Sequence, residues 1–154
     1  MPAVRKATDR DVPEIVAVIN SAFQVESDFR AGERTSLAEI SGVMQTDTFL
    51  VAIEHERVVG AVQVRVTGIT GYFGMLAVDP RQQRSGVGRA LLEAAENHCR
   101  ERGCTEMTLS TGSVRRELFP YYQKFGYRIA GVKPAPESAP FTRPIDIVKM
   151  VKPL

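Results

Sequence analysis

Apolar residues recur along the chain at two spacings, one typical of strands and one typical of helices. Over residues 58–66, valines alternate with polar or small residues, a spacing of two that predicts a half-buried strand. Over residues 12–23 and 87–102, apolar residues recur every three or four positions, which predicts helices that each bury one face. The chain therefore alternates between the two kinds of element.

Extending this pattern gives seven strands and four helices. The predicted strands span residues 3–6, 49–53, 58–66, 75–78, 105–110, 127–132 and 145–151. The predicted helices span residues 12–23, 36–44, 87–102 and part of 113–125. Pro120 cannot lie in a regular helix interior, so the last helix either begins late or kinks there. With no repeat and no linker, this order predicts one domain over residues 1–154, an α/β or α+β sandwich around one mixed sheet.

Composition narrows the function classes. The 154 residues are 44% hydrophobic and 25% charged, as in a globular domain with a real core. A net charge of +2, without a basic stripe, argues against a nucleic-acid platform. Residues 1–6 lack the apolar stretch of a signal peptide, and no run reaches membrane-spanning length, so we expect a cytoplasmic protein without membrane contact. Cys99 and Cys104 are expected to be free thiols, and two histidines are too few for a zinc site, so no metal is expected.

A glycine-containing basic loop lies between the strand at 75–78 and the helix that begins at 87. Backbone N–H groups at a helix start have no intrahelical partner, and the helix dipole makes that end positive. Gly86 and Gly88 allow a phosphate to approach the backbone closely. Three arginines add positive charge: Arg81, Arg84 and Arg89. These features predict an anion site suited to a pyrophosphate.

Two familiar phosphate-binding motifs do not fit this loop. A dinucleotide fingerprint needs a third glycine where the chain has Leu91, and it needs an acidic residue about 20 positions further on, for which there is no good candidate. A Walker A loop needs the pattern G-x-x-x-x-G-K-[ST], which does not occur in the chain. A dinucleotide-binding oxidoreductase module is therefore disfavoured.

A third pattern does fit. The run Gln83-Arg84-Ser85-Gly86-Val87-Gly88 resembles the Q/R-x-x-G-x-G/A motif of the GNAT superfamily, the acyl-CoA-dependent N-acyltransferases. Residues 76–80 resemble that family's central strand, and residues 122–127 resemble its Y-x-x-x-G-F/Y segment. The resemblance implies one mixed, mostly antiparallel central sheet flanked by about four helices, with acetyl-CoA as the acyl donor. The predicted donor-binding residues are Leu76, Ala77, Val78, Gln83, Arg84, Ser85, Gly86, Val87, Gly88 and Arg89.

The same resemblance makes Tyr122 the catalytic acid, which would protonate the departing thiolate. Tyr121 is adjacent and competes for this role. Some members of the family carry a glutamate on the central strand as base, but residues 72–75 contain no carboxylate. Water, or Glu26 or Glu33 from the polar segment after the first helix, is left as the proton acceptor.

The expected acceptor is a primary amine of a small molecule or peptide, attacked directly in a ternary complex. The sequence allows a homodimer but does not indicate the oligomeric state. The main alternative is a non-catalytic coenzyme A-binding sensor, which only the missing strand carboxylate favours.

Overall fold

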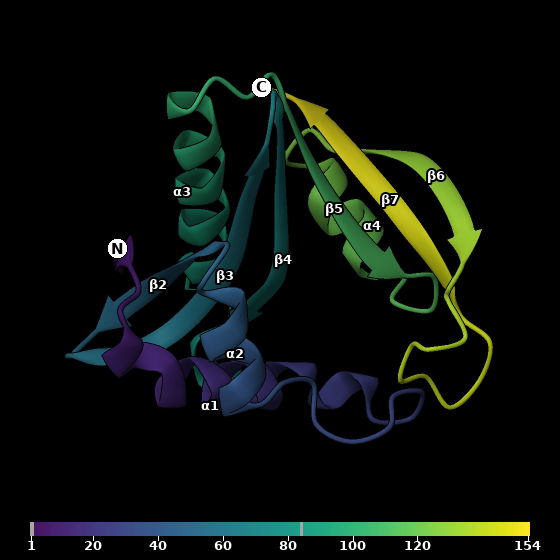
Figure 1. The fold of residues 1–154 in the computed structure, drawn as a ribbon, viewed down its shortest axis with the longest axis horizontal. Coiled ribbons are helices and arrows are strands. Elements are labelled where there is room, and N and C mark those ends of the chain that lie inside the picture. Colours follow the sequence, from purple (N-terminus) through teal and green to yellow (C-terminus); the bar gives the residue numbers. More distant parts are fainter. Residues whose placement is uncertain (1, 84) are drawn as a thin grey trace.

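Seven strands form one sheet in the order β1-β2-β3-β4-β5-β7-β6 (Figure 1). The computed structural model describes residues 2–83 and 85–154. The strands are β1 (Ala3–Lys6), β2 (Thr48–Glu54), β3 (Arg57–Thr67), β4 (Thr70–Val78), β5 (Glu106–Gly112), β6 (Arg128–Pro134) and β7 (Asp146–Pro153). The α-helices are α1 (Val12–Ala22), α2 (Leu37–Val43), α3 (Val87–Glu101) and α4 (Leu118–Gln123). Short 3-10 helices are η1 (Asp9–Asp11), η2 (Phe23–Glu26) and η3 (Pro80–Gln82).

The predicted mixed, mostly antiparallel sheet with four flanking helices is confirmed. Neighbouring strands pair antiparallel except β4 and β5, which pair in parallel. Ala61 of β3 packs with α1 and α2 in one apolar cluster, whereas its neighbour Val62 packs with α3 and α4 in another. Because adjacent side chains of a strand point to opposite faces, one helix pair covers each face of the sheet.

The alternation in β3 places its valines as expected but its polar residues differently. Val62 and Val64 are fully buried in the α3-side core. Gln63, expected on a polar face, is also buried, and its Nε2 donates a hydrogen bond of 2.6 Å to Asp47 Oδ2. The buried amide is tolerated because it has this partner.

The two strands at the centre of the sheet separate, and this shapes the site. Residues 70–72 of β4 pair with residues 106–108 of β5, after which the strands diverge (Figure 1). In β4, one extra residue lies between the partners of Ala61 and Gln63, and Met75 has a φ of 50°. This is a β-bulge, which bends a strand and ends its regular pairing. Residues 73–78 therefore have no strand partner on their β5 side among the described residues.

The segments around the predicted loop also form as expected, with two changes in bounds. Gly86 is the N-terminal cap of α3 at φ +89°, and Gly103 follows the helix at φ +84°, both in the left-handed region that favours glycine. Pro120 lies in the first turn of α4, so that helix begins late rather than kinking. β4 begins at Thr70 instead of residue 75, because a turn after Thr67 brings these residues back along β3.

Candidate active site

A cavity of about 1060 Å³ opens where β4 and β5 diverge. One side is formed by β4 and by the loop before α3, and the other by β5, α4 and the segment that joins them. The residues after α1 and the loop before β7 close the far end, the latter through Phe141. The β4 backbone that borders the cavity is the part without a partner on its β5 side, so its polar groups can bond a ligand.

Most of the predicted donor-binding residues meet at this cavity. Those that line it are Leu76, Ala77, Val78, Gln83, Gly86, Gly88 and Arg89. Arg84 lies outside the described residues. Ser85 and Val87 are not among the lining residues: the Ser85 hydroxyl donates to the carbonyl of Gln82, and the Val87 side chain is buried in the core beside Leu91. Any donor contact of Val87 would have to use its backbone.

Of the predicted loop arginines that lie in the described residues, Arg81 and Arg89, only Arg89 lines the cavity. Arg81 is not a lining residue, and its guanidinium bonds the Asp79 carboxylate at 2.9 Å on the surface. Arg89 does line the cavity, and it forms an exposed ion pair of 3.0 Å with Glu93 one turn along α3. An exposed pair of this kind is weak, so Arg89 can turn toward a phosphate at little cost.

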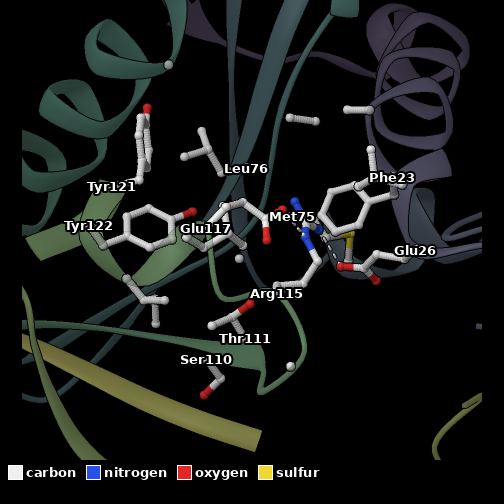
Figure 2. Close-up of a pocket in the computed structure, with 18 of the residues that line it drawn as sticks. Phe23, Glu26, Met75, Leu76, Ser110, Thr111, Arg115, Glu117, Tyr121 and Tyr122 are labelled. Carbon is white, nitrogen blue, oxygen red and sulfur yellow. Dashed lines mark hydrogen bonds and ion pairs between the residues drawn. The ribbon is translucent and has the colours of Figure 1, made fainter. Parts of the chain in front are cut away.

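The two neighbouring tyrosines of α4 point to different parts of the cavity. Tyr121 reaches the loop: a Cβ added to Gly88 would lie 2.7 Å from its hydroxyl oxygen. Tyr122 is 7% exposed, and Figure 2 shows its ring directed into the cleft toward Glu117. Burial, reinforced by the neighbouring Tyr121, raises the pKa of Tyr122 above its usual value near 10. The Tyr122 hydroxyl therefore keeps its proton at neutral pH.

Charged side chains join the far end of the cleft to the wall formed by β5 and α4. Arg115, between β5 and α4, donates from Nη1 to Glu26 Oε2 at 2.6 Å and from Nε to Glu117 Oε2 at 2.9 Å (Figure 2). Arg30 Nε donates to the other oxygen of Glu26 at 2.9 Å. Glu26 is 5% exposed, so this is a buried bridge from the segment after α1 to the β5 side. Both oxygens of Glu26 are thus occupied by guanidinium groups.

Glu117 has a different environment at the cleft centre. Burial raises its pKa, but the hydrogen bond and charge of Arg115 outweigh burial, so the pKa of Glu117 lies below its usual value. Its side chain is 63% exposed, and it borders the cavity. Glu117 is therefore an ionised carboxylate of low basicity that a ligand can reach.

A sequence comparison places these features in a known family. The model of the acetyltransferase (GNAT) family matches residues 14–127, which is most of the chain and includes the loop and both tyrosines. The chain belongs to the GNAT acetyltransferase family. The resemblance predicted from the loop and the tyrosine segment is thereby confirmed.

Relatives and solved structures agree with this assignment. The chain is 27% identical to an IAA acetyltransferase of Azospirillum brasilense over 135 residues, which cover 85% of this chain and 88% of the relative. It is 28% identical to a mycothiol acetyltransferase of Saccharopolyspora erythraea over 131 residues, 78% of this chain but only 41% of the relative. It spans 35% of a further relative, YxbD of Bacillus subtilis, at 38% identity over 55 residues.

Among solved structures, the fold matches Ard1 from Thermoplasma volcanium with a TM-score of 0.82 at 20% identity, covering 99% of this chain and 97% of the other. It matches the PaiA N-acetyltransferase of Thermoplasma acidophilum, solved in complex with coenzyme A, with a TM-score of 0.81 at 15% identity, covering 100% and 99%.

For this GNAT acetyltransferase, the structure separates the two glutamates considered as proton acceptors. Glu26 borders the cavity but is held by two arginines, and Glu33 is exposed and is not a lining residue. Sequence reasoning missed Arg115 and Glu117, which stand in a polar stretch with no motif. The only signal was the presence of both charges just before the tyrosine segment.

Three kinds of feature matter outside the cleft: metal-binding clusters, membrane-spanning helices and the two cysteines. Within the described part of the chain, no three His, Cys, Asp or Glu side chains gather as a metal site, and no helix is long and apolar enough to cross a membrane. Cys99 and Cys104 are buried free thiols. Burial, followed by the nearby Cys104, raises the pKa of Cys99 to about 12, so this thiol is a poor nucleophile.

Proposed function

We propose that this GNAT acetyltransferase transfers an acetyl group from acetyl-CoA to a primary amine of a small molecule or peptide. The amine attacks the thioester directly while both substrates are bound. The observation that carries the proposal is the unpaired edge of β4, residues 73–78, which borders a cavity with the glycine loop on one side and Tyr122 on the other. This arrangement offers an extended backbone for the donor's arm, amides for its phosphates and an acid at its thioester.

The donor would be held mainly by backbone groups. Gly86 and Gly88 bring the start of α3 to the cavity, where unpaired N–H groups and the helix dipole favour a pyrophosphate. The backbone of Leu76, Ala77 and Val78 can bond the extended arm. A backbone N–H of the same stretch can polarise the thioester oxygen, as an oxyanion hole does.

In the reaction, the amine nitrogen bonds to the acetyl carbon, the carbon–sulfur bond breaks, and the nitrogen loses one proton while the sulfur leaves as a thiolate. Tyr122 donates its hydroxyl proton to that sulfur, and the proton that the nitrogen gives up to water is returned to Tyr122 from the solvent. Its buried position supports this role, because a hydrogen bond to a developing charge is strongest where water is excluded.

Removal of the amine's proton is assigned to water. Glu26 has both oxygens bonded to guanidinium groups, and the low pKa of Glu117 makes it a weak base. The accessible carboxylate of Glu117 is better suited to orient the amine at the cleft centre, beside Tyr122.

The test is a panel of primary amines incubated with acetyl-CoA, with thiol release as the readout and Tyr122→Phe as the variant. Amine-dependent thiol release that falls in the variant supports the proposal. If coenzyme A raises the melting temperature but no amine releases thiol, the chain is a non-catalytic coenzyme A-binding domain. A thermal shift with NAD and none with acetyl-CoA would contradict donor binding altogether.

A further inference from the structure

The far end of the cavity carries more positive than negative charge. Three arginines and two glutamates line this end and the adjoining cleft centre: Arg30, Arg34, Arg115, Glu26 and Glu117. Glu26 pairs with Arg30 and Arg115, and Glu117 pairs with Arg115. Arg34 makes no hydrogen bond or ion pair with any residue in the described ranges 2–83 and 85–154. At this end of the cavity, the guanidinium of Arg34 therefore has no carboxylate partner among the described residues.

Arg34 is nevertheless held in place. Its guanidinium lies over the ring of Phe23, 5.2 Å from the ring centroid. The backbone of the next residue, Thr35, is fixed by Asn20, whose Oδ1 accepts from the Thr35 N–H at 2.9 Å and whose Nδ2 donates to the Thr35 carbonyl at 3.2 Å. Arg34 is thus a positioned cation and not a freely moving surface side chain.

The Nε of Arg34 is buried and has no hydrogen-bond partner among the described residues. Burial, reinforced by the charge of Arg30, lowers the pKa of the Arg34 guanidinium, although it stays protonated near neutrality. The nearest acids are engaged elsewhere: Glu26 by two arginines, and Glu39 by the hydroxyl of Thr35 at 2.5 Å. A buried donor without a partner is costly, so the unbonded Nε of this half-buried guanidinium calls for a partner, which a ligand in the cavity can supply.

We propose that Arg34 binds a carboxylate of the acceptor, so that the acceptor is a small amine that also carries a carboxylate. This inference rests on the proposed function, because it names the acceptor class of the same site. The planar guanidinium matches a carboxylate with two parallel hydrogen bonds. Glu117, at the cleft centre, would face the acceptor's ammonium, and Arg34 its carboxylate.

The rest of this end of the cavity is aromatic, which suits an apolar side chain carried by the acceptor beside its two charged groups. Phe23, Phe29 and Phe141 all line it, and the rings of Phe29 and Phe141 are 5.9 Å apart. The acceptors that fit are amino acids with an apolar or aromatic side chain. A polyamine fits poorly, since its second cation would face Arg34.

The experiment compares amino acids with their carboxamides, which keep the amine and the side chain but lose the negative charge. Each is offered with acetyl-CoA to the unaltered chain and to Arg34→Met, which keeps an unbranched side chain on Phe23. Arg34→Lys retains the charge without the planar fork, and Arg116→Met is the matched control at an exposed arginine outside the cavity.

We expect Arg34→Met to lower kcat/KM for the amino acids by about tenfold or more, the loss typical of a charged hydrogen bond. For the carboxamides the change should stay within about threefold, because no interaction with them is removed. Arg34→Lys should fall between, and Arg116→Met should match the unaltered chain. The melting temperature of the free protein should stay the same or rise in Arg34→Met, since a half-buried charge with an unbonded, buried Nε is removed. If Arg34 were purely structural, the variant would melt at a lower temperature.

The outcomes separate this inference from the proposed function. Equal use of amino acids and carboxamides, unchanged in Arg34→Met, overturns the carboxylate site and leaves amine acetylation intact. If amino acids raise the melting temperature, Arg34→Met abolishes this shift and no acceptor releases thiol, the carboxylate site is supported and acetyl transfer is overturned. If no acceptor releases thiol and no amino acid gives a thermal shift that depends on Arg34, both the carboxylate site and the proposed function are overturned.

Discussion

The buried bridge through Glu26 is expected to stabilise the fold, and Glu26→Gln tests this. The side chain of Glu26 is 7% exposed, and those of Arg30 and Arg115 are 13% and 15% exposed, so solvent screens these pairs little. Breaking a buried pair by removing one partner costs about 3–5 kcal/mol. Arg115 keeps Glu117, so we expect the lower end, about 3 kcal/mol. For a domain of this size, that corresponds to a fall in Tm of roughly 6–12 °C.

Thermal unfolding followed by circular dichroism or calorimetry measures this change. Glu33→Gln is the matched control, because Glu33 is exposed and outside the cavity, and it should change the free energy of unfolding by less than about 0.5 kcal/mol. Combining Glu26→Gln with Arg115→Met should cost less than the sum of the single changes, since the two residues share one interaction. A fall in Tm of less than about 2 °C for Glu26→Gln would refute the stabilising bridge.

The same variant tests whether Glu26 takes the proton from the amine. With both oxygens bonded to guanidinium groups, Glu26 is not expected to act as a base, so the pH profile of acetyl transfer should keep its shape in Glu26→Gln. The rate itself should fall by less than about tenfold, below the usual range for a direct general base. A limb near pH 6 to 7 that this variant abolishes would identify Glu26 as the base.

Further changes probe the tyrosines of the cleft, the glycines of the loop and a pair outside the cleft. Tyr122→Phe should lower kcat by about 10²-fold with the KM for acetyl-CoA little changed, and a larger loss in Tyr121→Phe would show that the other hydroxyl is the acid. Gly88→Ala places a Cβ 2.7 Å from the Tyr121 hydroxyl, so the free energy of coenzyme A binding, measured by titration, should fall by more than the free energy of unfolding, measured by thermal unfolding. Gly86→Val should lower both free energies, because φ +89° strains a β-branched residue. Burial raises the pKa of Asp47, but hydrogen bonds from a guanidinium and an amide outweigh it, so the folded pKa lies below the unfolded value near 3.9. Its stabilisation is full above that value and is lost as pH falls through the folded pKa, and Asp47→Asn should therefore flatten the fall in stability between pH 5 and pH 3, whereas an unchanged acid limb would contradict the pairing.

The parts of the fold that sequence predicts are those fixed by local patterns. The order of strands and helices follows from apolar spacing, and the start of α3 follows from Gly86, whose positive φ favours glycine. The meeting of the loop with the tyrosine segment also follows, but only through the family resemblance, since nothing local brings Tyr121 of α4 to Gly88 at the start of α3. The resemblance also selects Tyr122 over Tyr121, and the directions of the two hydroxyls are consistent with that choice.

The parts that sequence does not predict depend on contacts between distant segments. Glu26 and Arg115 are 89 positions apart, and neither spacing nor motif indicates that they meet. The β-bulge at Met75 arises in a run that reads as an ordinary strand. Gln63 is buried only because Asp47 lies next to it on the neighbouring segment. In each case a polar or strained position becomes tolerable through a partner that local patterns do not show.

The cleft is built from groups that the fold leaves unsatisfied on both sides of Tyr122. On the donor side, the edge of β4 loses its strand partner where β5 diverges, and on the proposed acceptor side the half-buried Arg34 has a buried Nε without a hydrogen-bond partner among the described residues. Each would lower the stability of a chain that had no ligands. A ligand that binds only the folded state returns this free energy, about 2.7 kcal/mol at a concentration of 100 Kd. The unsatisfied groups of the free protein are therefore the ones that its two substrates are expected to complete, next to a Glu26–Arg115 bridge that is already satisfied within the chain.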